Sequence, residues 1–339
     1  MSGGCDVAQA TSRVVESGAA AGPGEPEDEV LSETAGIFWV VIAAILFGSQ
    51  FVLNRLSAGM PSASYNATMA LGIAAGSGAA LIPLGFGSIA PPMALLAFLG
   101  GAIWVVGNYL FIVAVARVGI ARSYVVINFS AVLSFAGGIV FLGELPGLGG
   151  SRLLLVAAAV ALVLAGSWLV TTTAPRGGSP GGPDGSQTVR GLLAAFASTA
   201  FFAAYNVLAA YVMNRAGTPA GATLIAVAPG IAAGAFAVAA LAPGALRAWR
   251  AAPLRSHVLA ALQGATWAAA MVCILFGWMG VGIALGTSIQ VGAQTLVSSL
   301  WGILLFGELD GTTNRRAAGF RFAAGAALTV CGIVGITAV

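Results

Sequence analysis

The chain has 339 residues, of which 59% are hydrophobic and only 7% charged, with a formal net charge of +3 and a mean hydropathy of +0.97. This composition excludes an ordinary soluble globular domain. All basic residues are arginines, and they lie between the apolar segments or in their first or last turns. Such arginines are typical of anchors that flank membrane spans, so the positive charge does not indicate a nucleic-acid partner. We therefore expect a multi-pass integral membrane protein embedded in a lipid bilayer.

Residues 1–34 differ in composition from the rest of the chain. They contain seven of the eleven acidic residues, are rich in glycine and alanine, and show no apolar periodicity. Because such a segment cannot bury enough apolar surface to fold, it is predicted to be a disordered acidic tail. The tail lacks both the basic start and the apolar core of a signal peptide.

Ten apolar segments follow the tail, each long enough to supply the roughly 20 residues that a membrane-spanning helix needs. They cover residues 35–53, 64–86, 92–116, 120–142, 150–172, 190–213, 220–243, 256–279, 283–306 and 316–338. The stretch 173–189 is rich in proline and glycine and predicts a flexible linker. It separates two five-segment halves, 35–172 and 190–339. The three cysteines (Cys5, Cys273 and Cys331) do not indicate a disulfide framework.

The second half repeats motifs of the first. Gly101-Ala-Ile-Trp104 recurs as Gly264-Ala-Thr-Trp267 after 163 residues, and a Leu-Gly-Glu-Leu motif at 142–145 recurs as Phe-Gly-Glu-Leu at 306–309. Because each half contains an odd number of segments, the second half enters the membrane from the opposite side. The sequence therefore predicts an all-α membrane protein with ten transmembrane helices in two inverted five-helix repeats. This architecture is typical of transporters that work by alternating access.

Three further motifs resemble those of a known family. They are Gly100-Gly-Ala-Ile-Trp-Val-Val-Gly-Asn108 in the third segment, Phe47-Gly-Ser-Gln-Phe51 in the first, and Ser298-Ser-Leu-Trp-Gly-Ile-Leu-Leu-Phe-Gly-Glu308 in the ninth. Together they resemble the glucose/ribose porter branch of the drug/metabolite transporter superfamily, in particular its transmembrane protein 144-like carbohydrate transporters. The resemblance covers about residues 35–339 and implies a ten-helix fold with a carbohydrate as substrate. The fourth segment departs from the family pattern at Asn128-Phe-Ser and at Arg122.

Two criteria for the orientation of the chain disagree. One predicted side carries Arg55, Arg117, Arg122, Arg176, Arg190, Arg247, Arg250, Arg255, Arg315, Arg316 and Arg321, and the other carries Arg13, Arg152 and Arg215. An excess of arginine marks the cytosolic side, which would place both termini outside the cytosol. Members of the family are usually drawn with cytosolic termini. The orientation, the membrane and the direction of transport therefore stay open at the level of sequence.

Charged residues are absent from the middle of every predicted span. A carboxylate there is typical of exporters of cationic substrates, and clustered His, Asp or Glu would be needed for a metal site or for hydrolytic catalysis. We therefore expect no enzymatic activity, no cofactor and no metal. The single histidine, His257, begins the eighth segment and is expected at the surface. Glu144 and Glu308 end two segments and are expected to pair with arginines, with proton coupling as the alternative.

Neutral amides and aromatic side chains are abundant within the spans instead. The candidate substrate-binding residues are Gln50, Trp104, Asn108, Tyr124, Asn128, Tyr205, Asn206, Gln263, Trp267, Gln290 and Gln294. Several of them stand four residues apart, which places them on one helix face. Amides offer donors and acceptors to hydroxyl groups, and an aromatic ring suits the C–H face of a sugar. The pattern favours a neutral carbohydrate or polyol, and the structural alternative for each residue is a hydrogen bond between helices.

Other interpretations of the chain are a transporter of a nucleotide sugar or amino acid, or a membrane receptor or scaffold. An anionic substrate would need inward-facing arginines, for which only Arg122 and Arg321 are placed. A receptor or scaffold would not need inverted halves. Gly72 and Pro229-Gly230 fall at matching places in the second and seventh segments and predict a hinge. The glycine-rich stretch 325–335 suits close helix packing and is a candidate homodimer face.

Overall fold

The computed structural model describes residues 33–57, 60–84, 87–143, 149–171, 185–306 and 315–337. In these ranges every regular element is a helix, and no strand occurs. The helices are α2 (Glu33–Leu56), α3 (Ser62–Leu84), α4 (Pro91–Val118), α5 (Ile120–Ile127), α6 (Phe129–Gly137), α7 (Gly150–Thr171), α8 (Gly185–Ala210), α9 (Ala220–Leu241), α10 (Ala245–Ala251), α11 (Leu254–Val281), α12 (Ile283–Phe306) and α13 (Arg315–Thr337). Two short π-helices, η1 (Gly138–Leu142) and η2 (Tyr211–Arg215), continue α6 and α8.

Six of the described helical stretches are long and apolar enough to cross a membrane. They are Glu33–Leu56, Pro91–Val118, Ser186–Met213, Ala220–Leu241, Leu254–Val281 and Leu285–Phe306. The outer faces of the bundle carry large apolar side chains, among them Phe38, Leu193 and Leu304, which are more than half exposed. Soluble monomers rarely expose apolar surface on this scale. The all-helical class is therefore confirmed, and the helices are consistent with residence in a membrane.

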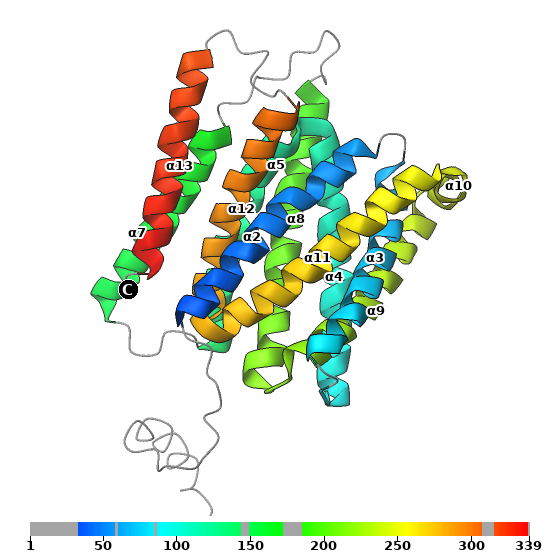
Figure 1. Cartoon of the computed structure of the whole chain (residues 1–339), viewed down its shortest axis with the longest axis horizontal. Helices are drawn as coiled ribbons and strands as arrows, with labels where there is room; N and C mark the ends of the chain where they lie inside the picture. Colours follow the sequence, from blue (N-terminus) through cyan, green and yellow to red (C-terminus); the bar gives the residue numbers. More distant parts are fainter. Residues whose placement is uncertain are drawn as a thin grey trace, which may run out of the picture.

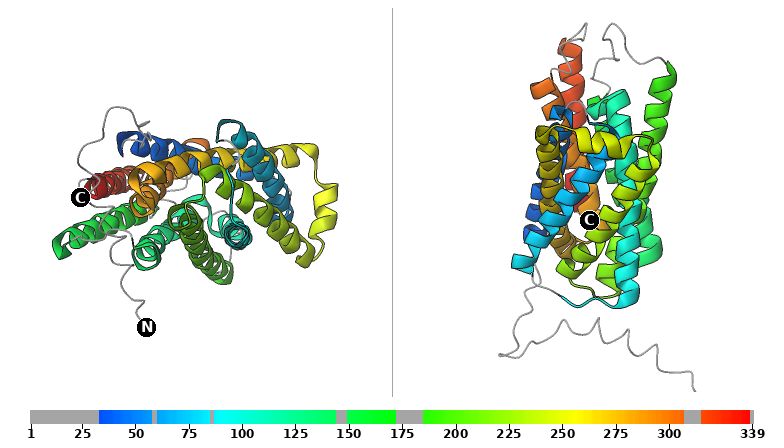
Figure 2. Two further views of the ribbon diagram at one scale, coloured as in Figure 1. Left: turned by 90° about the horizontal axis from the view of Figure 1, so that it is seen from below. Right: turned by 90° about the vertical axis from the view of Figure 1, so that its right-hand side faces the viewer.

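The long helices form two facing layers (Figure 1 and Figure 2). α2, α11 and α12 lie side by side in the front layer of Figure 1, and α4, α5 and α8 lie behind them. α3 and α9 pack on α11 and α4 at one side of the bundle, next to the short α10, whereas α7 and α13 pair at the opposite side. α2 begins at the lower end of the bundle in Figure 1, and α13 runs downwards in the same view to the lower part of the α7–α13 pair.

Glycines allow α3 and α11 to touch backbone to backbone. The two helices cross at Gly72 and Gly264. A methyl group added to Gly72 would overlap with the carbonyl oxygen of Ala261, and one added to Gly264 would overlap with that of Met69. Small residues at helix contacts are typical of membranes, where lipid is as apolar as the helix surface and close packing must hold the helices together.

α4 crosses α9 in the same manner. A methyl group added to Gly101 would overlap with the carbonyl oxygen of Val227, and one added to Gly230 would overlap with that of Phe98. Gly72 and Gly230, which the sequence places at matching positions, therefore both occupy tight helix crossings. Their action as hinges stays a prediction.

The glycine-rich stretch 325–335 of α13 packs on α7 of the same chain. A methyl group added to Gly166 would collide with the Gly325 carbonyl and with Thr329, and one added to Gly332 would collide with the carbonyl of Ala159. The glycine-rich face that was a candidate homodimer contact therefore packs, at these glycines, on α7 of the same chain.

The helices differ from the predicted segments in three places. The fourth segment is divided into α5, α6 and η1, with a turn at Asn128. The predicted linker is shorter, because α8 already begins at Gly185, and residues 173–184 lie outside the described part of the chain. The helix α10 was not predicted, and it follows a turn in which Gly244 adopts a φ of 73°. Of the predicted acidic tail, only Glu33 and Thr34 are described.

His257, which was expected at the surface, is only partly exposed. Its Nδ1 lies 3.0 Å from Thr68 Oγ1, and its Nε2 lies 3.0 Å from the carbonyl oxygen of Trp249. The Trp249 indole donates to the same Thr68 hydroxyl at 2.7 Å. The unpredicted helix α10 causes the difference, because it carries Trp249 against the imidazole. His257 thus joins α3, α10 and α11.

Candidate substrate cavity

A cavity of about 80 Å³ lies between the two helix layers, which is enough for several water molecules. Both halves of the chain contribute to its wall, through α2, α4, α5, α6, α8, α11 and α12. The lining residues are Phe47, Gln50, Phe51, Trp104, Asn108, Phe111, Ile127, Ser130, Phe202, Tyr205, Asn206, Trp267, Met271, Ile274, Trp278, Gln290, Val291 and Gln294. Eight of the eleven candidate binding residues are in this set: Gln50, Trp104, Asn108, Tyr205, Asn206, Trp267, Gln290 and Gln294.

Two tryptophans meet in the cavity wall. The ring centroids of Trp104 and Trp267 are 4.7 Å apart, with 55° between the ring planes. Each is the fourteenth residue of a 28-residue helix, α4 or α11, so both lie midway along the bundle. The rings of Phe47 and Tyr205 lie 6.5 Å from that of Trp267. Aromatic pairs in this range contribute about 0.5–1.5 kcal/mol each beyond burial, so the rings form a defined surface for a ligand.

Several polar groups of the cavity are only partly paired within the protein. Gln290 Nε2 donates to Gln294 Oε1 one turn further along α12. Gln50 Oε1 and Trp278 Nε1 are buried without a hydrogen-bond partner. A buried polar atom left unpaired costs about 1–3 kcal/mol. A ligand or water that pairs with these atoms would therefore bind favourably.

Two asparagines of the cavity use one amide nitrogen each to bond a neighbouring helix. Asn108 Nδ2 donates to Asn66 Oδ1 of α3 at 2.7 Å. Asn206 Nδ2 donates to Ser134 Oγ of α6 at 3.1 Å. Because an asparagine amide carries two donors and an acceptor, each retains polar capacity after making this bond. The two side chains are therefore both anchored by a neighbouring helix and able to bind a ligand.

Three candidate residues lie outside the cavity lining. The Tyr124 hydroxyl donates to a backbone carbonyl of α2 at 3.0 Å. Asn128, at the turn between α5 and α6, lies 2.7 Å from Thr295 Oγ1 of α12. Gln263 Oε1 accepts a bond of 2.6 Å from the Tyr65 hydroxyl of α3. These side chains link helices, which is the structural alternative that the sequence analysis named.

Ten residues of the lining were not predicted from the sequence, and all but Ser130 are apolar or aromatic. They are Phe47, Phe51, Phe111, Ile127, Ser130, Phe202, Met271, Ile274, Trp278 and Val291. The spacing of some of these residues along their helices could have indicated that they line the cavity. Phe111 follows Trp104 by seven residues, and Met271 and Trp278 follow Trp267 by four and eleven, so they share a face with the tryptophans.

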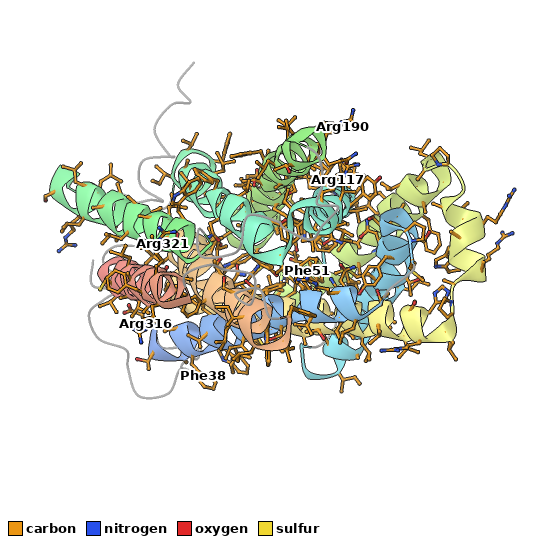
Figure 3. All side chains as sticks on the ribbon, turned by 90° about the horizontal axis from the view of Figure 1, so that it is seen from above. Phe38, Phe51, Arg117, Arg190, Arg316 and Arg321 are labelled. Carbon is orange, nitrogen blue, oxygen red and sulfur yellow. The ribbon has the colours of Figure 1, made fainter. Side chains whose placement is uncertain are left out.

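Three aromatic rings lie between the middle of the cavity and one end of the bundle. Phe51, Phe111 and Tyr124 contact one another edge to face, with centroids 4.9, 5.9 and 5.2 Å apart. In the view from above in Figure 3, Phe51 lies between the helix layers, whereas Arg117 and Arg190 lie towards the periphery. We call these three rings the aromatic cluster, and the end of the bundle beyond them the arginine-rich end.

At the arginine-rich end α2 and α12 are joined by two further contacts. Trp301 Nε1 donates to Ser49 Oγ at 2.8 Å. The guanidinium of Arg55 lies 4.5 Å from the centroid of the Phe306 ring, which is a cation–π contact. Aromatic rings and these two contacts therefore lie between the middle of the cavity and the arginine-rich end.

A second, larger hollow of about 490 Å³ lies at the arginine-rich end, outside the bundle core. Tyr109 and Arg117 of α4 contribute to it, together with the start of α3 and residues 242–248. None of the candidate binding residues lines this hollow. We therefore place the candidate site in the smaller central cavity, where those residues converge.

Among the residues that the structure describes, no charged side chain lines the central cavity. In the described part of the chain, no three residues of His, Cys, Asp or Glu form a group that could hold a metal ion. Glu144, Glu308 and the side chain of Arg122 lie outside the described residues. Because an unpaired charge is expensive to bury away from water, this lining suits an uncharged ligand.

Comparison with known proteins defines the fold alone. No protein-family model matches the sequence, and no curated protein matches it. Twenty-eight chains of solved structures match the model. One of them, described only as "Crystal structure of protein", matches with a TM-score of 0.59 and 16% sequence identity, over 87% of this chain and 96% of that chain. At this identity the similarity establishes a shared fold and carries no information on ligands.

Proposed function

We propose that this chain is a multi-pass membrane transporter that moves a neutral carbohydrate or polyol by alternating access through the central cavity. The observation that carries the substrate class is the lining, which combines partly unpaired amides with packed aromatic rings and, in its described part, contains no charged side chain. In this proposal Gln290, Gln294 and Asn108 hydrogen-bond hydroxyl groups of the substrate, and Trp104 and Trp267 pack on its C–H face. Amides suit this task because they both donate and accept.

The two glycine crossings support an inverted repeat. Gly101 and Gly264 are repeat equivalents 163 residues apart, and Gly72 and Gly230 hold matching places in the second and seventh predicted segments. The repeat exchanges α3 with α9 and α11 with α4, so it converts one crossing into the other. We infer ten transmembrane helices in two five-helix halves, related by a pseudo-twofold axis in the membrane plane. The Trp104–Trp267 pair would lie at this axis.

The motif resemblance to the glucose/ribose porter branch supports the same substrate class. For orientation, we propose that the arginine-rich end faces the cytosol, because an excess of arginine marks the cytosolic side of membrane proteins. Both termini would then lie on the opposite side. Because the described lining residues include no carboxylate, facilitated diffusion or exchange is the simplest mode of transport.

Uptake into proteoliposomes tests the proposal. The panel should contain labelled hexoses, pentoses and polyols, with a nucleotide sugar and an amino acid as alternatives, each with and without an imposed pH gradient. We expect saturable uptake of at least one neutral sugar or polyol that does not depend on the gradient. If only the nucleotide sugar or the amino acid is taken up, the proposed class of neutral sugars and polyols is wrong and that compound's class takes its place. Binding without uptake would favour a receptor.

A further inference from the structure

Asn66 lies outside the cavity, yet it contacts a residue that lines it. Asn66 belongs to α3, is 1% exposed, and is not part of the lining. Its side chain reaches α4 and hydrogen-bonds Asn108, which does line the cavity. Asn66 is not one of the eleven candidate residues predicted from the sequence. Its contacts determine which atom of Asn108 is available to a ligand.

A backbone carbonyl determines which asparagine of this pair donates the hydrogen bond and which accepts it. Asn66 Nδ2 lies 3.4 Å from the carbonyl oxygen of Val105, and a carbonyl oxygen can only accept. Asn66 must therefore turn its nitrogen towards the α4 backbone and its Oδ1 towards Asn108. Because Oδ1 also can only accept, Asn108 must offer its nitrogen, which lies 2.7 Å away. The same nitrogen lies 3.5 Å from Met69 Sδ, a weak acceptor for its second hydrogen.

This arrangement commits the nitrogen of Asn108 to the protein and leaves its Oδ1 out of both contacts. Nδ2 donates to Asn66 Oδ1 and lies against Met69 Sδ, and Oδ1 takes part in neither interaction. Gln50, in the last two turns of α2, also lines the cavity with an unpaired oxygen, Oε1. Both residues lie between the Trp104–Trp267 pair and the arginine-rich end. Two acceptors thus belong to this part of the wall.

We propose that Asn66 is a positioning residue that sets substrate selectivity. By holding the nitrogen of Asn108, it presents Asn108 Oδ1 as a fixed acceptor for one hydroxyl hydrogen of the substrate. An amide that could rotate would present either its NH2 group or its oxygen at that position. A held amide presents only its oxygen, which bonds only to a hydrogen-bond donor. The nature of the substrate rests on the proposed function, but the Asn66–Asn108 bond does not.

Selectivity against deoxy analogues tests the proposal, because a site that bonds a hydroxyl rejects the analogue that lacks it. Asn66→Leu removes both bonds while keeping an apolar side chain of similar size. Asn66→Asp is the conservative variant, because a protonated carboxyl of the same shape can donate to the Val105 carbonyl and accept from Asn108. Ser77→Ala is the matched control, since Ser77 is buried on the same helix without a hydrogen-bond partner.

Uptake of the best substrate should be compared with uptake of each of its monodeoxy analogues. We expect the wild type to reject one analogue by about tenfold or more, and Asn66→Leu to lose most of that rejection at this one hydroxyl. Asn66→Asp and Ser77→Ala should retain it. An equal loss of uptake for the substrate and all analogues in Asn66→Leu would overturn the proposal. Asn66→Ala replaces Asn66→Leu if the latter does not fold.

A double-mutant cycle tests the bond without any assumption about transport. Thermal unfolding in detergent should be measured for Asn66→Leu, Asn108→Leu and the double variant. We expect the double variant to lose clearly less stability than the sum of the single losses, because bonded residues couple. Strict additivity would overturn the inference. If the wild type moves none of the sugars or polyols, the proposed function fails, and the cycle still decides whether Asn66 holds Asn108.

Discussion

The glycine crossings and the central cavity share two helices, α4 and α11, but pack them in opposite ways. At Gly72 and Gly230 the backbones of neighbouring helices touch, and no side chain fits between them. In the cavity, large rings and amides separate the layers, and Gln50 Oε1 and Trp278 Nε1 stay unpaired. A contact without free volume has one arrangement, because packed interiors resist deformation. The comparison indicates that rigid helix pairs flank a site whose polar groups are left open for a ligand.

The largest effect is expected from a substitution that disrupts the crossing of α3 and α11. Gly72→Ala places a methyl group into the Ala261 carbonyl, so the two helices must separate, and overpacking of this kind typically costs about 1–3 kcal/mol or more. We expect a several-fold loss of monodisperse protein in detergent and a lower melting temperature. Gly78→Ala on the same helix is the control, because a methyl group there meets no atom within 4 Å. Equal behaviour of the two variants would contradict the tight crossing.

A smaller set of effects should be confined to transport, and Gln294→Ala is the first. Gln294 lines the cavity and accepts from Gln290, and a substrate hydroxyl or Gln290 left unpaired costs about 1–3 kcal/mol. We expect transport to fall at least tenfold with an unchanged yield of folded protein. Thr266→Ala is the control, because its hydroxyl bonds its own helix. Normal substrate affinity in Gln294→Ala would remove the residue from the site.

The tryptophan pair should show a more modest effect. Trp267→Phe keeps an aromatic ring but reduces the surface against Trp104, and we expect the KM of uptake to rise about fivefold, which corresponds to roughly 1 kcal/mol. Trp168→Phe serves as the comparison, because Trp168 is 61% exposed and does not line the cavity. A KM that rises equally in both variants would show that the effect is not specific to the cavity.

The smallest effect is expected outside both regions. If Glu144 and Glu308 pair with arginines at segment ends, changing both to Gln should leave net flux intact and insensitive to a pH gradient, since an exposed ion pair contributes only about 0–1 kcal/mol. Flux should be measured with the gradient in each direction. The expectation fails if wild-type uptake follows the proton gradient and the double variant retains only gradient-independent exchange.

The long apolar helices could be predicted because the length and apolar composition of a segment can be read without knowing which other segments it contacts. The convergence of Trp104, Trp267 and Gln290 was also visible, from repeat position and four-residue spacing. That spacing identifies a helix face but not the helix it meets, so Tyr124 and Gln263 were expected in the cavity and instead link helices. The contact of His257 with Trp249 was not predicted, because a seven-residue helix such as α10 leaves no readable periodicity in the sequence.

Sided labelling of a cysteine in the cavity tests the central claim most directly. Ser130 lines the cavity, and Ser130→Cys can be made in a background where Cys5, Cys273 and Cys331 are serine. In sealed vesicles with one protein orientation, a membrane-impermeant thiol reagent is supplied from either side, with and without the transported sugar. The account predicts labelling from both sides and slower labelling with sugar. Labelling from one side only, at a rate that saturating sugar does not change, would contradict it.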